Sequence, residues 1–316
     1  MSIIEAVDAA SFTSAFPNIT FAIRHELADN PLFTLPRLLQ LQARLPRDRI
    51  EFNSGKVGIT QDPDSTPMVD LPPDEIIRRI ETCSAWMVLK SVEDDPEYRA
   101  LIDQVLLSVV KANGYKSLND AGFHDIRGFI FISSPNSVTP FHADNENNIF
   151  VQIHGGKRFH VYDNRNNSIA SEEAIENVLI KHRNLKFDPS FDTNGVHYEL
   201  SPGDGIFVPY QWPHWVGTTD GYSISMAITW KTNDILWRND LLTVNSMLRS
   251  LGLPQATPGR SKALDSIKVT TLRSAKAVID PLRKNETMRR VLRRIALGRR
   301  ANYYLNTAKA TDSKAA

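Results

Sequence analysis

Short apolar runs separated by turn residues dominate the middle of the chain. The clearest of these runs cover residues 85–90, 128–133, 148–162, 200–209 and 223–230. They are rich in β-branched and aromatic residues and are bounded by glycine, proline, asparagine and aspartate, a pattern typical of β-strands joined by turns. Inside the third run, Gly155-Gly156 indicates a tight turn, so this run predicts two strands joined as a hairpin.

Helical spacing of apolar residues is found on both sides of this strand-rich region. Thr34 at a capping position, followed by a proline in the first turn, predicts a helix directly after it. The sequence Pro72-Pro73-Asp74-Glu75 predicts a second helix, whose apolar positions continue to Cys83. A helix is also expected at 96–112, and the amphipathic pattern that starts at Ile235 predicts another.

These patterns divide the chain into three zones. Residues 1–84 are expected to form a mixed α/β wrap, residues 85–232 the strand-rich core, and residues 233–316 a helical region. The wrap either narrows the entrance to a site in the core or only packs against the core, and the residues favour neither alternative.

An insertion between two core strands is expected at 164–194, with a helix that begins after Ser171. Insertions of this kind commonly carry specificity. Lys181-His182-Arg183 and Lys186 lie in this insertion and could contact an acidic substrate. A solvated loop is the favoured interpretation of this short basic stretch.

A metal-ligand pattern joins two of the apolar runs. His142 and Asp144 stand two residues apart, and His214 follows a Pro-Gly-Asp turn and an apolar strand, 72 residues after His142. Alternate residues of a strand point to the same side, so the first two side chains can bind one ion from one strand while a neighbouring strand supplies the third. Two imidazoles and one carboxylate, with open positions opposite, are typical of mononuclear non-haem Fe(II) sites. The alternative, that the histidines only cap or pack a loop, is disfavoured by the complete set.

Lys157 begins the strand after Gly155-Gly156, fifteen residues after His142. A lysine that points into an apolar core is costly unless an anion pairs with it. Beside an Fe(II) site, the anion that fits is the distal carboxylate of 2-oxoglutarate. An exposed lysine at a strand end is the usual alternative, and composition alone would favour it. His154 and His160 flank Lys157, and a structural role is expected for each of them.

The motifs around these residues resemble the JmjC-type, cupin-like 2-oxoglutarate oxygenases over roughly residues 85–232. The matching segments are Thr139-Pro-x-His142-x-Asp144-x-x-x-Asn148, Gln152-Ile153-x-Gly155-x-Lys157-Arg158, Ser201-Pro-Gly-Asp204 to Pro209-x-x-Trp212-x-His214, and Ser223 to Trp230. The likeness is strongest to the branch that includes the asparaginyl hydroxylase of hypoxia-inducible factor. It implies a mainly β fold with a double-stranded β-helix, or jelly-roll, core and flanking N-terminal and C-terminal helices.

The resemblance also implies roles for individual residues. It makes His142, Asp144 and His214 the Fe(II) ligands and the catalytic centre. Lys157 and Thr139 would hold the far carboxylate of 2-oxoglutarate, and Asn148 would line the cosubstrate site.

Two positions depart from that branch of the family. The branch often adds a tyrosine to the cosubstrate carboxylate, but the matching strand at 85–90 contains Trp86 and Lys90 and no tyrosine. After His214, an asparagine of the branch is replaced near Ala227. Substrate recognition by the asparaginyl hydroxylase is therefore not transferred to this chain.

The implied activity is that of a Fe(II)- and 2-oxoglutarate-dependent dioxygenase that uses O2 to hydroxylate a C–H bond. A protein or peptide side chain is the first expected substrate, and a small amino acid or natural-product intermediate is the second. An alternative of another class is a metal-binding cupin that acts as a sensor or adaptor without turnover. Retention of metal without decarboxylation of 2-oxoglutarate would support that alternative.

Composition agrees with a soluble enzyme. The net charge is +1 and 41% of the residues are hydrophobic, which gives no strong attraction to nucleic acid and enough apolar residues for a substantial core. Cys83 is the only cysteine, which excludes an internal disulfide and a cysteine-based zinc cluster. No signal peptide and no membrane span are expected, so a reducing, cytoplasmic location is the prediction.

Arginine is dense between residues 283 and 300, where the apolar residues fall largely on one side. By the resemblance, C-terminal helices pair two protomers, so a homodimer through this region is one interpretation. A basic helix could also bind nucleic acid or anionic lipid, or dock on its own chain as a surface helix. Docking or dimerisation is favoured over nucleic acid. Residues 308–316 are expected to be disordered.

Overall fold

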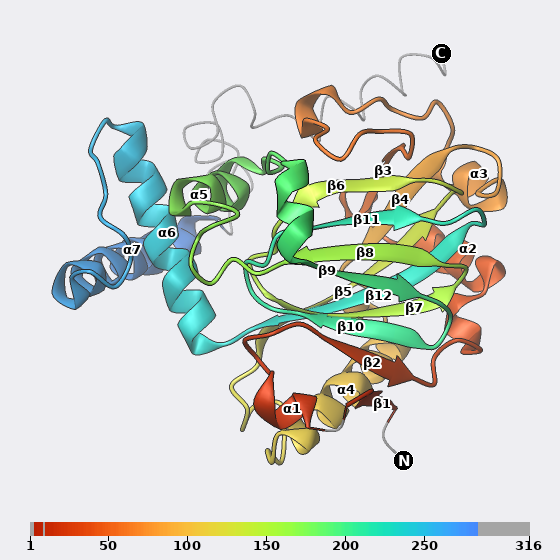
Figure 1. Ribbon diagram of the computed structural model, residues 1–316, viewed down its shortest axis with the longest axis horizontal. Coiled ribbons are helices and arrows are strands. Elements are labelled where there is room, and N and C mark those ends of the chain that lie inside the picture. The colour runs from red at the N-terminus through yellow and green to blue at the C-terminus, as the bar shows by residue number, and fades with distance from the viewer. Residues whose placement is uncertain (1–2, 9, 284–316) are drawn as a thin grey trace. The chain divides into compact units, whose positions relative to one another are not determined.

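Two antiparallel β-sheets build the core of the protein in a computed structural model, which describes residues 3–8 and 10–283 (Figure 1). The larger sheet has the order β1 (Ile4–Ala6), β2 (Phe21–His25), β10 (Asp204–Val208), β7 (Asn147–His154), β12 (Ser223–Lys231), β5 (His124–Ser133), β4 (Ala85–Lys90) and β3 (Ile50–Ser54). The smaller sheet has the order β6 (Val138–His142), β11 (His214–Thr218), β8 (Lys157–Tyr162) and β9 (Gly195–Leu200). The fold is a jelly roll with added helices, which confirms the predicted fold class.

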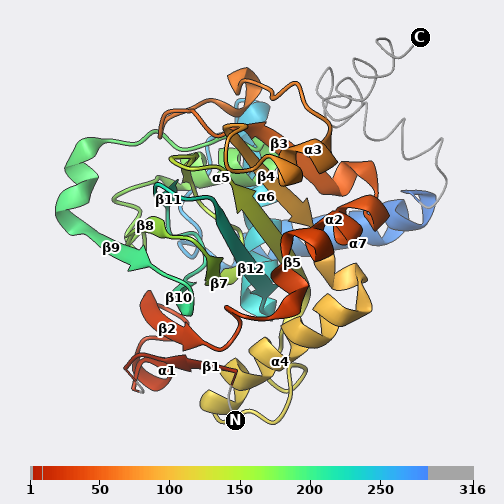
Figure 2. The ribbon, with the colours of Figure 1, turned by 90° about the vertical axis from the view of Figure 1, so that its right-hand side faces the viewer.

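Helices cover the outer face of the larger sheet (Figure 2). They are α2 (Leu35–Arg44), α3 (Pro73–Arg78) and α4 (Pro96–Ala112). Outward-pointing residues such as Ile130 on β5 and Met226 on β12 are fully buried with Ile102 and Leu106 of α4 in one apolar cluster. Removal of this apolar surface from water is the main force that holds the helices on the sheet.

A second apolar cluster fills the space between the two sheets. It contains Phe150 of β7 and Ala227 of β12 from the larger sheet, and Phe159 of β8 and Val216 of β11 from the smaller. Alternate residues of a strand point to opposite faces, so each of these strands contributes one set of side chains to this inner face. Any polar side chain on the same face lies in an apolar, water-poor environment.

The predicted hairpin at Gly155-Gly156 is wrong in its pairing. β7 and β8 flank this turn, but β7 pairs with β10 and β12 in the larger sheet, whereas β8 pairs with β11 and β9 in the smaller. Gly155 has φ +66°, and a Cβ there would lie 2.1 Å from the carbonyl oxygen of Tyr222. The turn therefore carries the chain from one sheet to the other, although its sequence has the signal of a hairpin.

The other predicted elements are present with small changes in length. β4 and α4 have the predicted limits, and the side chain of Asp95 accepts a hydrogen bond from the Glu97 amide at the start of α4. The helix predicted after Pro72 is α3, which ends at Arg78 rather than near Cys83 because the chain must turn into β4. The predicted helices after Ser171 and near Ile235 are α5 (Glu172–Lys181) and α6 (Asn233–Ser250).

The division of the chain into three zones stays a prediction. The first zone and the boundary near the C-terminus can nevertheless be described. The first 84 residues include short helix α1 (Ser11–Ser14) and supply three strands, β1, β2 and β3, to the larger sheet. The chain separates into two compact units, residues 1–246 and 247–316, so the boundary falls inside α6.

The second unit contains the end of α6 and α7 (Lys262–Arg283). Apart from Arg283, the predicted basic helix lies outside the described residues, and so does the predicted disordered segment at 308–316. No helix within the described part of the chain is both long and apolar enough to cross a membrane.

Candidate metal centre

His142, Asp144 and His214 come together at one end of the space between the sheets. His142 is the last residue of β6, His214 is the first residue of β11, and the two are cross-strand partners. Asp144 lies in the loop after β6 rather than on the strand. Its Oδ1 is 3.9 Å from His142 Nε2, and its Oδ2 is 3.7 Å from His214 Nε2. Nitrogen and oxygen ligands lie about 2.0–2.2 Å from an ion such as zinc, so one ion can contact all three side chains.

Backbone carbonyls hold both imidazole rings. His142 Nδ1 is 2.7 Å from the carbonyl oxygen of Pro140, and His214 Nδ1 is 2.9 Å from that of Trp212. Because a carbonyl oxygen only accepts hydrogen bonds, each Nδ1 carries the hydrogen and each Nε2 presents its lone pair. Histidine ligands of metal ions are commonly oriented in this way, so the rings are set for metal binding before an ion arrives.

Exposure differs across the three ligands. Burial, and then the nearby charge of His142, lower the pKa of His214 to about 4, so its imidazole is neutral at pH 7 as a metal ligand must be. The side chain of His214 is 3% exposed, whereas those of His142 and Asp144 are 27% and 26% exposed. The centre is therefore closed behind His214 and open to solvent beside the other two ligands.

Asn148 supports the carboxylate of the centre. It lies on β7, is buried, and its Nδ2 donates a hydrogen bond to Asp144 Oδ2 at 3.2 Å. The Asn148 Oδ1 is buried without a hydrogen-bond partner among the described residues. The resemblance places Asn148 in the cosubstrate site; in the structure its amide orients the Asp144 carboxylate.

Lys157 lies toward the opposite end of the same inner face. It pairs with Thr218 on β11, four residues from His214, which is about 13 Å along a strand that rises about 3.3 Å per residue. Lys157 is 2% exposed, so it is not the exposed lysine that composition alone favours. Thr139 pairs with Val216 on the inner face, and this places it between the two ends.

The Lys157 ammonium has no carboxylate partner among the described residues. Its Nζ donates a hydrogen bond to Ser225 Oγ at 2.8 Å and lies 5.4 Å and 5.3 Å from the ring centroids of Phe131 and Phe150. Burial lowers the pKa of Lys157 to about 7. Cation–π contacts recover only part of the lost hydration, so an anion bound here would be strongly favoured.

Two further polar groups on the sheet near Lys157 lack partners. Trp86 on β4 and Ser133 on β5 are cross-strand partners, and Trp86 Nε1 and Ser133 Oγ are both buried without hydrogen bonds among the described residues. The Trp86 ring lies 5.9 Å from that of Phe131, which contacts Lys157. This strand, in which the resemblance led us to look for a tyrosine, thus contributes an indole N–H, a group that can donate to an anion.

Sequence reasoning missed Ser133 and Ser225. The signal that could have found Ser225 is the alternation of Ser223 and Ser225 with large apolar residues in a strand that is buried up to its last residue. Buried serines on the same side of a core strand indicate a polar ligand or partner at that side.

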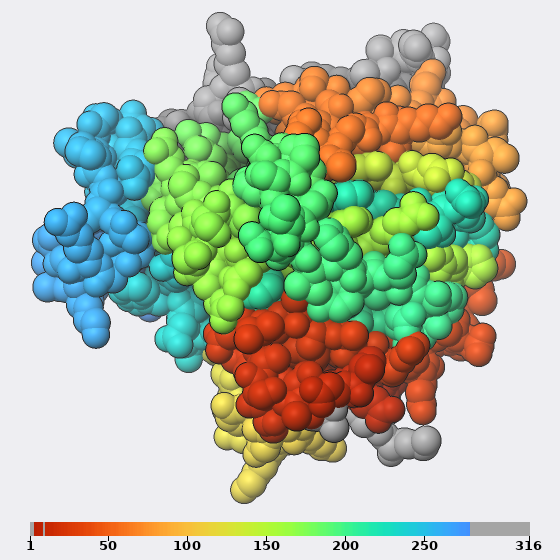
Figure 3. Space-filling view, viewed as in Figure 1, coloured from red at the N-terminus to blue at the C-terminus, as the bar shows by residue number. Residues whose placement is uncertain are grey.

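Two segments from distant parts of the sequence cover the free edge of β6, next to His142. The amide of Phe141 donates to the carbonyl of Ile59, and the amide of Leu185 donates to the carbonyl of Phe141, each at 2.8 Å. These segments, coloured orange and green, lie side by side on the surface (Figure 3). They protect the edge of the strand that ends in a metal ligand.

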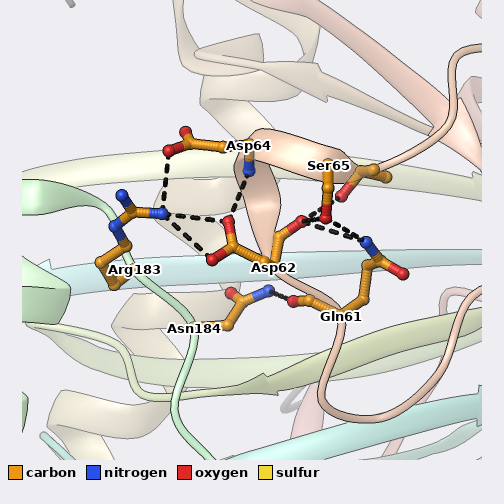
Figure 4. A network of polar contacts seen from close by, with 7 residues as sticks. Gln61, Asp62, Asp64, Ser65, Arg183 and Asn184 are labelled. Carbon is orange, nitrogen blue, oxygen red and sulfur yellow. Dashed lines mark hydrogen bonds and ion pairs between the residues drawn. The ribbon is translucent and has the colours of Figure 1, made fainter.

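An ion-pair network joins these two segments (Figure 4). Arg183 Nη1 lies 3.0 Å from Asp62 Oδ1 and 2.9 Å from Asp64 Oδ2, and Asn184 Nδ2 donates to the carbonyl of Gln61 at 2.7 Å. Arg183 is thus engaged within the chain, whereas Lys181 and Lys186 are exposed and could still contact an acidic substrate.

Replacing Arg183 with alanine is expected to loosen this edge with little loss of global stability. Partly exposed ion pairs contribute about 0–1 kcal/mol, so the midpoint of thermal unfolding should fall by less than about 3 °C. Amide exchange should accelerate at 59–65 and 182–187. Arg158→Ala, which removes the exposed pair with Glu199, is the control and should leave these amides unchanged. Unaltered exchange at both segments in Arg183→Ala would contradict the role assigned to the network.

The strand order is that of a jelly roll of the cupin type, and comparison with protein families agrees. The cupin-like domain family matches residues 88–234. No curated protein matches the chain. Among solved structures, the chain is similar to YcfD, a ribosomal oxygenase from Escherichia coli, at 13% identity over 87% of this chain and 68% of that chain, with a TM-score of 0.45.

Two other solved structures are also similar to the chain, with the following identities, coverages and TM-scores. A complex of the Escherichia coli YcfD with cobalt and succinic acid has 14% identity over 91% of this chain and 70% of that chain, with a TM-score of 0.44. The DMSP lyase DddQ from Ruegeria pomeroyi has 17% identity over 34% and 39%, with a TM-score of 0.22. The fold assignment rests on the family match and the strand order.

Proposed function

We propose that this protein is an Fe(II)- and 2-oxoglutarate-dependent oxygenase that hydroxylates a C–H bond. One observation carries the proposal: a two-histidine, one-carboxylate centre and a buried lysine that has no anionic partner among the described residues share one inner face. The first feature suits a mononuclear iron site with open positions. The second suits one carboxylate of a short dicarboxylate whose other end reaches the metal.

His142, Asp144 and His214 would hold the iron, and Lys157, Ser225 and Thr139 would hold the distal carboxylate of 2-oxoglutarate. When bound, iron, 2-oxoglutarate and O2 supply the oxidation: 2-oxoglutarate loses CO2 and takes one oxygen atom to become succinate, and the other oxygen atom enters the substrate C–H bond. Trp86 and Ser133 are further donors for the carboxylate, in place of the family's tyrosine.

The chain's own residues position these groups and exclude water. Asn148 orients the Asp144 carboxylate, and the carbonyls of Pro140 and Trp212 orient the two imidazoles. The apolar cluster between the sheets keeps the surroundings of Lys157 dry, and a dry environment strengthens the attraction between its ammonium and a carboxylate. A substrate would approach from the open side, beside His142 and Asp144.

A protein or peptide side chain is the proposed substrate, and this choice rests on the motif resemblance described above. A small amino acid or natural-product intermediate is the competing substrate class. The proposed homodimer through the C-terminal region draws support from α7, where Leu264, Ile267 and Val278 are exposed apolar side chains.

Anaerobic reconstitution with Fe(II) and 2-oxoglutarate tests the proposal. The wild-type protein should develop the visible metal-to-ligand charge-transfer band of an iron–2-oxoglutarate complex, and addition of O2 should yield succinate. His214→Ala should give neither signal. His154→Ala is the matched control, because His154 is exposed and stacks on Tyr222, and it should behave as wild type. Metal-loaded, folded wild type that gives no band and no succinate would favour a non-catalytic metal-binding cupin.

Once succinate formation is established, substrate class is the next measurement. Peptides and free amino acids are supplied in parallel, and the ratio of succinate formed to hydroxylated product is determined. A ratio near one with a peptide supports the proposed substrate, whereas coupling only with a free amino acid or other small metabolite supports the competing class.

A further inference from the structure

The outer face of the smaller sheet carries a second group of metal-ligating side chains. His160 on β8 and His197 on β9 are cross-strand partners, and Asp192 comes from the 3-10 segment η5 (Pro189–Asn194) directly before β9. One ligand atom from each of the three residues lies within 4.8 Å of the others. Phe159 and Val161 point to the inner face, so His160 between them points outward and the group is separate from the iron centre.

The two imidazoles lie within hydrogen-bond distance of each other. His160 Nδ1 and His197 Nδ1 are 2.5 Å apart, so one nitrogen carries a hydrogen and the other presents a lone pair. A divalent cation bound by both lone pairs would displace that hydrogen, and the two rings would move apart so that each nitrogen lies about 2.0–2.1 Å from the ion. Two facing imidazoles from adjacent strands thus provide half of a tetrahedral ligand set.

A chain of hydrogen bonds orients the carboxylate. Trp215 Nε1 donates to Tyr162 Oη at 3.2 Å, and Tyr162 Oη donates to Asp192 Oδ1 at 2.6 Å. The other carboxylate oxygen is left for a ligand. Hydrogen bonds from neighbouring groups that fix a ligating carboxylate are a regular part of metal sites.

The histidine rings are also positioned by packing. Trp215 stacks on His160 with ring centroids 3.8 Å apart and an interplanar angle of 7°. A Cβ on Gly195 would lie 3.1 Å and 3.2 Å from ring atoms of His197, so glycine leaves the room that this ring occupies. Burial, together with the charge of His197, lowers the pKa of His160 to about 4. The His160 imidazole is therefore neutral, as metal binding requires.

We propose that His160, Asp192 and His197 bind a divalent late first-row transition-metal ion, with zinc as the first choice. Two imidazoles and one carboxylate suit zinc, which is commonly four-coordinate and imposes little geometry of its own. Water would complete the coordination at this partly exposed site. The bound ion would join η5 and the edge strand β9 to β8, and so restrain the edge of the smaller sheet. The site does not depend on the proposed oxygenase activity.

Zinc titration of the metal-free, full-length chain against a competing chromophoric chelator tests this site. Wild type should bind two equivalents, one at each histidine–aspartate group, and His197→Ala should lose one. His214→Ala should also bind one equivalent, and the His197→Ala/His214→Ala double variant should bind none tightly. His154→Ala, another exposed histidine on the surface, is the matched control and should retain both equivalents.

Amide exchange gives a readout that does not involve the iron centre. In His214→Ala, zinc should slow exchange across 189–200, and the additional change Asp192→Asn should weaken zinc binding by at least about tenfold, because the neutral amide is a poor ligand. The proposal is overturned if His197→Ala binds as much zinc as wild type with the same affinity. It is also overturned if zinc leaves exchange across 189–200 unchanged in His214→Ala.

Discussion

Lys157→Met is expected to raise the midpoint of thermal unfolding of the ligand-free protein and to abolish tight binding of 2-oxoglutarate. The folded chain holds the Lys157 ammonium in an apolar environment, where burial lowers its pKa from 10.5 to about 7. At about 1.4 kcal/mol per pKa unit, that difference corresponds to about 4–5 kcal/mol. Methionine has a similar length and no charge, so most of this cost disappears when it replaces lysine.

The stability gain should depend on pH in a defined direction. Between pH 7 and 10.5 the unfolded chain keeps a proton that the folded chain has released, so wild-type stability rises with pH through this window. The advantage of methionine is therefore largest at and below pH 7 and fades toward pH 10.5. Allowing for the lost hydrogen bond to Ser225 and the lost cation–π contacts, a net gain of about 2–3 kcal/mol, or about 4–10 °C, is expected at pH 7.

Calorimetry from pH 6 to 10 measures the change in the unfolding midpoint of Lys157→Met. Anaerobic titration of the metal-loaded protein with 2-oxoglutarate measures the change in affinity. Affinity for 2-oxoglutarate should fall at least about 100-fold, because its buried carboxylate would lose the ammonium of Lys157 as a partner. Lys186→Met, at an exposed position, should change neither quantity. A lower unfolding midpoint at pH 7, or unchanged 2-oxoglutarate affinity, would argue against an anion site at Lys157.

Asp144→Ala is expected to lower iron affinity by more than about 100-fold and to remove succinate formation. Among the described residues, Asp144 supplies the only carboxylate of the group that could hold the ion, and its loss leaves two imidazoles to hold a divalent cation. Asn148→Ala should have a smaller effect, about 10–100-fold on iron affinity, since outer hydrogen-bond partners of metal ligands commonly contribute that much. Competition with a chelator under anaerobic conditions measures both affinities.

Asp220→Ala serves as the control for this pair, because Asp220 is an exposed carboxylate after β11 and should leave iron affinity unchanged. The Asn148 variant also separates two roles. Weaker iron binding with unchanged 2-oxoglutarate affinity supports its hydrogen bond to Asp144 as the relevant contact. Unchanged iron binding with weaker 2-oxoglutarate binding would support the place of Asn148 in the cosubstrate site, as the motif resemblance implies.

Features encoded by neighbouring residues could be predicted from the sequence. The start of α4 follows from Asp95 and Pro96, and the strands follow from apolar runs between turn residues. The three residues of the candidate metal centre were also identified, since a His-x-Asp pair and a distal histidine at a strand start form a motif. The structure places these three residues together as expected.

Features that depend on which strands pair could not be predicted. The sequence at Gly155-Gly156 fits a turn in either case, whether the next strand pairs with the preceding one or crosses to the other sheet. The pairing of β8 with β7 was therefore predicted wrongly, since β8 pairs with β11 and β9. His160 and His197 face each other only because β8 pairs with β9 across an insertion. Neither residue has a motif, and their proximity is a property of the folded sheets alone.

Because His142 pairs with His214 across β6 and β11, the candidate metal centre is complete only when these two strands have paired. Its ligands lie 72 residues apart in the chain, and they meet only after the smaller sheet has assembled. Contacts of this separation form late and slowly in β-rich proteins because loop closure must come first. An ion that requires all three ligands binds the native state almost exclusively, so its binding free energy adds to the free energy of unfolding. With iron as the proposed occupant, iron supply in a cell would then influence how much of this chain persists in its native form.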